Sequence, residues 1–205
     1  MGRIRGLLAA GVIVMVAAPD LFAQEPPDLP YIPQVPTTVS ITHYPVSGRN
    51  LRDVLDDTRF SGPIGYEAEI QYSPNPFFMY EPGPNGCVLT HLEIALDITI
   101  RYPEWTDYDR ARRSERQRWD ARMQVLAVHE NVHAVIALYG TSLAFNHAAE
   151  TPPAADCDTL RELLDARLET GFSRLSDWQR AYDDETNHGE LQHEFDFQAF
   201  IASLD

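Results

Sequence analysis

The chain contains no lysine, and its basic residues are few. All 16 basic residues are arginine, against 31 acidic residues, and the formal net charge is −15. The phosphate backbone of DNA or RNA would repel so acidic a protein, which argues against a nucleic-acid partner. The acidity itself is explained by the solubility that a net charge gives to a protein.

Cysteine is also scarce. The two cysteines, Cys87 and Cys157, stand alone, and neither belongs to a C-x-x-C pair. An even number of cysteines in an exported protein favours a disulfide, so we prefer a Cys87–Cys157 bond to the alternative of two zinc ligands. The bond would close a loop of about 70 residues and stabilise the fold by roughly 4 kcal/mol in the chain-entropy model.

Long apolar runs are missing except near the start. Residues 7–18 are apolar, follow Arg3 and Arg5, and precede a small-residue cleavage site ending at Ala23. This layout predicts a secretory signal peptide over residues 1–23. The alternative is an uncleaved membrane anchor, but the run is too short to span a bilayer comfortably. We therefore expect an exported protein, periplasmic or extracellular, with no stable membrane insertion after cleavage.

The rest of the chain divides into a tether and one domain. Residues 24–37 contain five prolines and predict an extended tether. In the domain, residues 38–205, alternating apolar and polar residues predict strands, and Asn50 is expected to cap a short helix. The expected strands cover residues 37–44, 66–72 and 88–102, the short helix covers 51–60, and a proline- and glycine-rich loop covers 74–86.

Helices dominate the second half of the domain. We expect a long helix over residues 106–143, capped by Thr106 with Asp109 at the third helical position. Its part from Met123 to Leu138 is apolar nearly all round and should be buried. A second helix is expected over 157–182 and a last short one over 190–204. Strands first and helices afterwards predict an α+β fold.

The buried part of the long helix contains the motif H-E-x-x-H, at His129-Glu130-Asn131-Val132-His133. Residues four apart lie on one helix face, so both imidazoles can reach one ion. Glu130 is then placed to act as the general base on a metal-activated water without binding the metal. The apolar flanks disfavour the alternative of a solvent-exposed helix, because buried His and Glu side chains need polar partners.

A catalytic zinc ion needs a third protein ligand. His188 is the best candidate, because Gly189 gives the chain freedom to turn the imidazole inward. His193 and Glu194 are alternatives, and Glu185 is a weaker one.

H-E-x-x-H is followed by Y-D-x-x-T-x-H-G, formed by Tyr182, Asp183, Thr186, His188 and Gly189. Together the two motifs resemble a bacterial family, domain-of-unknown-function family 922, described as predicted secreted zinc-dependent proteases. The resemblance covers about residues 38–195, most of the chain after the signal peptide. It implies a metallopeptidase.

We therefore expect a zincin-like α+β fold, in which a small sheet packs on the long active-site helix and a second long helix lies behind it. One zinc ion is expected to bind to His129, His133 and His188. The expected substrate is a protein or peptide, and the sequence leaves the oligomeric state open.

Two further roles follow from proximity in the sequence. Tyr182 is expected to donate a hydrogen bond to the oxyanion, and Asp183 is expected to orient a ligand histidine through its second ring nitrogen. Two other functions stay open: an envelope binding or scaffold protein with a structural zinc, and a zinc amidase acting on cell-wall peptide. Glu130 argues against the first, because a structural site has no use for that carboxylate.

Overall fold

The computed structural model describes residues 31–63 and 67–203. The predicted signal peptide and the first part of the predicted tether lie outside these residues. The end of the tether belongs to the fold: Val35 is buried, and the backbone carbonyls of Gln34 and Pro36 accept hydrogen bonds from Ile94 and Leu96. The packed domain therefore begins a few residues earlier than the first predicted strand.

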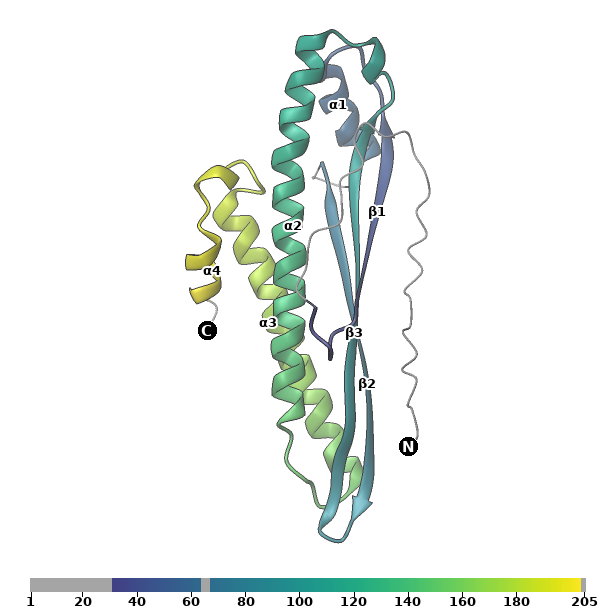
Figure 1. The fold of residues 1–205 in the computed structure, drawn as a ribbon, viewed down its shortest axis with the longest axis vertical. Helices are drawn as coiled ribbons and strands as arrows, with labels where there is room; N and C mark the ends of the chain where they lie inside the picture. Colours follow the sequence, from purple (N-terminus) through teal and green to yellow (C-terminus); the bar gives the residue numbers. More distant parts are fainter. Residues whose placement is uncertain (1–30, 64–66, 204–205) are drawn as a thin grey trace, which may run out of the picture.

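The structure is α+β, as predicted, with a three-stranded sheet against a long helix and a second long helix behind it (Figure 1). The sheet order is β1-β3-β2, with β1 parallel and β2 antiparallel to the central β3. The strands are β1 (Thr37–Val46), β2 (Glu69–Gly83) and β3 (Gly86–Trp105). The helices are α1 (Leu51–Ser61), α2 (Arg113–Ala149), α3 (Cys157–Thr186) and α4 (Phe197–Ser203), with short 3₁₀ turns η1 (Tyr108–Arg110) and η2 (Gln192–Glu194).

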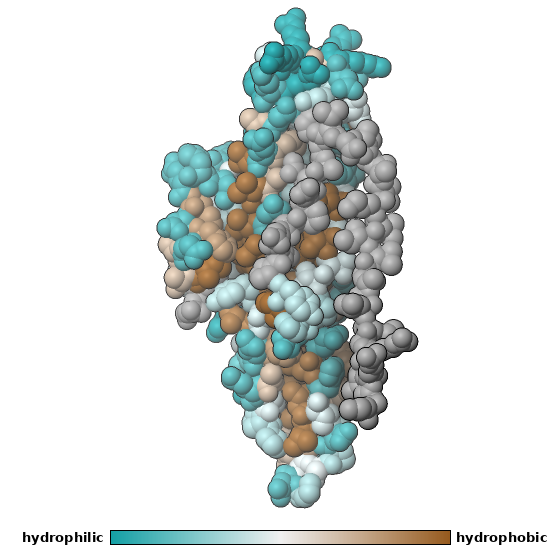
Figure 2. All heavy atoms as spheres, viewed as in Figure 1, coloured by the Kyte–Doolittle hydropathy of each residue, from teal (hydrophilic) through white to brown (hydrophobic). Residues whose placement is uncertain are grey.

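The core lies between the sheet and α2. Alternate residues of β3 point to α2 and are almost fully buried: Ile94, Leu96, Ile98 and Ile100. Ala134 and Ala137 on α2 share a core cluster with Leu96, Ile98 and Ile100, and their small side chains allow helix and sheet to approach closely. Three further clusters of buried apolar residues extend the core beyond this one. Figure 2 shows apolar side chains along the middle of the visible face.

The predicted loop over residues 74–86 is wrong, because β2 continues to Gly83. Within the described residues β2 pairs with β3 alone and is therefore an edge strand. An edge strand tolerates proline where the missing N–H would face outward. Leu96 and Ile94, the β3 partners of Pro74 and Pro76, direct their own N–H groups away from β2, so both proline nitrogens lie on the free edge.

The predicted start of the long helix is also wrong. Thr106 does not cap α2, because its backbone N–H and its hydroxyl both donate to the carbonyl of Val46 and continue the β1–β3 pairing. The helix begins at Arg113 and runs to Ala149, beyond the predicted end. Its middle is not buried all round, since Val125 and Val128 are about half exposed.

The other helices follow the sequence signals more closely. Asn50 caps α1 as predicted, and its side-chain oxygen accepts a hydrogen bond from the backbone N–H of Asp53. Asp156 caps α3 in the same way, and α3 ends at Asn187, which is left-handed. The last helix is shorter than predicted and begins only at Phe197.

Cys87 and Cys157 form the predicted disulfide, which ties the end of the β2–β3 hairpin to the first residue of α3. Among the described residues, none of the helices combines the length and apolar character needed to cross a bilayer.

Candidate metal centre

His129 and His133 lie one turn apart on α2 and are both buried. Their Nε2 atoms face each other at 3.2 Å. The i, i+4 spacing of the motif therefore brings two nitrogen ligands to one point, as predicted.

The third group at this point is Asp183, near the end of α3. Its Oδ1 lies 3.2 Å from His129 Nε2 and 3.0 Å from His133 Nε2. The three ligand atoms lie within 4.8 Å of one another and could hold one metal ion. Partial burial by itself raises the pKa of Asp183, but its contacts with the two imidazoles outweigh burial and hold the pKa below its usual range. A negatively charged oxygen is thus available to a cation.

The outer ring nitrogens are held by two glutamines. Gln192 Oε1 lies 3.2 Å from His129 Nδ1, and Gln179 Oε1 lies 2.5 Å from His133 Nδ1. An amide oxygen only accepts, so each Nδ1 donates its proton outward and leaves the Nε2 lone pair directed at the common point. Gln179 is further fixed because its amide nitrogen donates to the carbonyl of His133.

This arrangement changes the expected role of Asp183. The task of orienting the histidines through their second nitrogens falls to Gln179 and Gln192, while Asp183 contacts the Nε2 atoms. The sequence did carry one signal for Gln179, which stands four residues before Asp183 and so on the same helix face. Gln192 lies past the end of α3, where helical spacing gives no guidance.

Tyr182 supports the site from inside the core. Its ring stacks on His129 at 4.8 Å between centroids, and its hydroxyl donates to Gln192 Oε1 at 2.5 Å. The side chain is fully buried and is not part of the pocket lining described below. The geometry therefore gives Tyr182 the role of positioning Gln192 and His129 and lends no support to the predicted oxyanion contact.

Three consecutive left-handed residues, Asn187, His188 and Gly189, turn the chain after α3. The φ of Gly189 is +89°, which favours glycine, and a Cβ atom there would make a tight contact of 3.2 Å with Cγ of His129. His188 Nδ1 lies 3.5 Å from Asp183 Oδ1, and the side chain is 48% exposed. His188 is thus beside the metal centre but outside the convergent group, and its role as a ligand stays a prediction.

The alternative ligands are more distant from this arrangement. His193 and Glu194 lie on η2, contact each other and are largely exposed. Neither belongs to the group of side chains that could hold a metal among the residues the structure describes.

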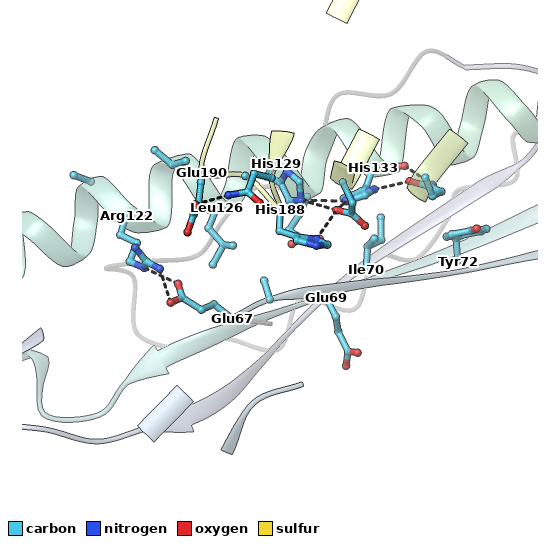
Figure 3. A pocket seen from close by; sticks show the side chains of 18 residues that line it. Glu67, Glu69, Ile70, Tyr72, Arg122, Leu126, His129, His133, His188 and Glu190 are labelled. Atoms are coloured by element: carbon cyan, nitrogen blue, oxygen red, sulfur yellow. Dashed lines mark hydrogen bonds and ion pairs between the residues drawn. The ribbon is translucent and has the colours of Figure 1, made fainter. Parts of the chain in front are cut away.

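Glu130, His129, His133 and Asp183 open onto one pocket of about 960 Å³ between α2, the start of β2 and the turn after α3 (Figure 3). Burial raises the pKa of Glu130 to about 7. One part of the pocket is bounded by an ion pair between Arg122 on α2 and Glu67 just before β2. The remaining lining residues are Ala68, Glu69, Ile70, Tyr72, Ala121, Val125, Leu126, Gln179, Asn187, His188, Gly189 and Glu190.

Gln179→Leu should weaken metal binding about 10-fold to 100-fold, because His133 loses the acceptor that fixes its ring and tautomer. Competition with a fluorescent zinc chelator measures the dissociation constant. Gln124→Leu, the same change at an exposed position of α2, should leave the constant unchanged. Equal affinity of the Gln179→Leu and wild-type proteins would show that the glutamine does not orient the ligand.

Comparison with known proteins finds one match, to a protein family. Neither the curated proteins nor the solved structures contain a match to this chain. The sequence profile of one bacterial family matches residues 41–189, a segment that includes H-E-x-x-H, Asp183, His188 and Gly189. The chain therefore belongs to DUF922, a family of bacterial proteins of unknown function.

Proposed function

We propose that the chain is an exported zinc-dependent peptidase with a zincin-like site, which hydrolyses peptide bonds in a protein or peptide substrate. The observation that carries the proposal is the convergence of His129, His133 and Asp183 on one point in a pocket that also contains Glu130. Two imidazoles and one carboxylate form a known ligand set of catalytic zinc sites.

Zinc suits this donor set better than other common divalent ions. Imidazole nitrogen is a favoured ligand of zinc, whereas magnesium and calcium prefer oxygen ligands throughout. When bound, a zinc ion lowers the pKa of a coordinated water molecule and polarises a substrate carbonyl group. Three protein ligands leave one position for water or substrate.

Glu130 supplies the proton transfers. Among the described residues its side chain makes no hydrogen bond with either imidazole of the motif, and it lines the pocket beside them. A carboxyl group with a pKa of about 7 can accept a proton from the attacking water and return it to the leaving amine at neutral pH. A purely structural metal site needs no such group, which disfavours the scaffold alternative.

The disulfide supports export, because such bonds persist in oxidising compartments. The predicted signal peptide would deliver the protein there. Sequence and geometry support a peptidase and a cell-wall amidase equally in their metal chemistry, so the substrate screen below includes both classes.

Glu130→Gln should retain about one zinc ion and lower kcat by roughly 100-fold or more, because the amide cannot accept the proton of the attacking water. The measurement uses residues 24–205 with the disulfide formed, zinc-loaded, against a panel of quenched fluorescent peptides and cell-wall peptide fragments. Glu150→Gln, at the exposed end of α2, is the matched control and should keep wild-type turnover.

Unchanged turnover of Glu130→Gln would exclude Glu130 as the base. Cleavage of cell-wall fragments without cleavage of peptides would assign the chain to the amidase class. A zinc-loaded wild-type protein that cleaves neither class would leave a binding or scaffold protein as the explanation.

A further inference from the structure

Tyr102, on β3, carries a polar atom that the fold leaves without a partner. The side chain is 2% exposed, and its hydroxyl is the one buried side-chain polar atom with no hydrogen-bond partner among the residues the structure describes. Burying a hydroxyl group without a hydrogen-bond partner destabilises a fold. Phenylalanine would fill the same space without this cost, so the hydroxyl group needs an explanation.

The position of Tyr102 explains which group its hydroxyl can meet. Tyr102 follows Ile98 and Ile100 on the face of β3 that packs on α2, and it shares a core cluster with Ala127 and Ala134 of that helix. Glu130 lies three residues after Ala127 and four before Ala134, hence on the same stripe of α2. Glu130 is therefore presented to the sheet between two alanines, whose short side chains leave room beside its carboxylate.

The electrostatics agree with this geometry. Burial raises the pKa of Tyr102 above its usual range, and the negative charge of Glu130 raises it further. Among the described residues, Glu130 is the one charged group that raises the pKa of this phenol. The phenol therefore keeps its proton at neutral pH and faces the carboxylate as a hydrogen-bond donor.

We infer that Tyr102 positions Glu130, its hydroxyl donating a hydrogen bond to a water molecule that in turn donates to the Glu130 carboxylate. One carboxylate oxygen is then held towards the sheet, and the other faces the metal centre across the pocket. The catalytic consequence rests on the proposed function, in which Glu130 is the general base. The contact between the two side chains does not depend on that function.

A double-mutant cycle on thermal unfolding tests the contact without an activity assay. Tyr102→Phe should lower the Tm of the zinc-loaded protein by roughly 2–4 °C. In a Glu130→Ala background the same change should leave the Tm unchanged or raise it, because the hydroxyl has no acceptor left. Tyr44→Phe is the control: its hydroxyl donates to the carbonyl of Glu67, so its effect should be equal in both backgrounds.

Turnover gives a second readout. Tyr102→Phe should lower kcat by roughly 10-fold to 100-fold with KM and zinc content unchanged, because the base is misplaced while substrate and metal still bind. If Tyr102 only fills space in the core, Tyr102→Phe should leave kcat unchanged, and its Tm shift should be the same in both backgrounds.

Equal Tm shifts for Tyr102→Phe in both backgrounds would overturn the inference. If the Tm shift of Tyr102→Phe differs between the two backgrounds but the wild-type protein cleaves no substrate, the contact is supported and the peptidase proposal is refuted. The two failures are thus distinguishable.

Discussion

Asp183→Ala should release most of the bound zinc, whereas His188→Ala should leave about one ion per chain. Asp183 Oδ1 contacts the Nε2 atoms of both His129 and His133, while His188 Nδ1 lies 3.5 Å from Asp183 Oδ1 and its side chain is about half exposed. Removing a ligand atom abolishes one bond to the ion, and removing its neighbour weakens the site far less. Mass spectrometry of the native protein after dialysis measures the zinc content directly.

His129→Ala is the reference for complete loss, because both the motif and the geometry place it in the group that could hold the ion. Zinc loss with His188→Ala but not with Asp183→Ala would make His188 the third ligand, as the sequence alone suggested. Loss with both changes would indicate that the site uses the aspartate and the histidine together. Asp183→Asn refines the result, since the amide keeps an oxygen but loses the charge that balances the cation.

Replacing both cysteines, Cys87→Ser with Cys157→Ser, should lower the free energy of unfolding by about 4 kcal/mol. The disulfide spans 70 residues, and a cross-link over so long a loop restricts the unfolded chain strongly. For a domain of this size the Tm should fall by roughly 10 °C. Urea unfolding followed by circular dichroism gives the free energy, and calorimetry gives the Tm.

Wild-type protein treated with a reducing agent is the control and should reproduce the Tm of the double variant. Thiol titration of the unreduced, denatured wild type should find no free thiol, as the structure has none among its described residues. An unchanged unfolding free energy would show that the hairpin stays on α3 through packing alone.

Local patterns predicted the parts of the fold that local interactions determine. The i, i+4 spacing of His129 and His133 was sufficient to place both on one face of a helix, and Asn50 was recognisable as a cap. The alternation of apolar and polar residues was sufficient to predict the strand β3. The disulfide followed from cysteine number and isolation, and the α+β class followed from the order of the elements.

Other features depend on contacts between distant segments and left no local signal. The prolines after Tyr72 looked like a loop, because only pairing with β3 shows that their nitrogens lie on a free edge. Asp183 was recognised as part of the site, but the sequence does not reveal which nitrogen of each histidine it meets, and in the structure it lies beside the Nε2 atoms. Gln192 reaches His129 through the turn after α3, and Tyr102 packs against α2 from the sheet; no spacing rule connects either residue to α2.

The two prolines on the outer edge of β2 also limit how copies of the chain can associate. An exposed strand edge with free N–H and C=O groups invites pairing with another molecule and growth into aggregates. Beyond Tyr72 the next two outward positions, Pro74 and Pro76, offer no N–H group, and a third proline, Pro82, follows near the hairpin end. The outward donors that remain before them belong to Ile70 and Tyr72, beside the pocket. The prolines thus remove the N–H groups with which a second chain could pair on the part of β2 that follows the pocket-lining residues Ile70 and Tyr72.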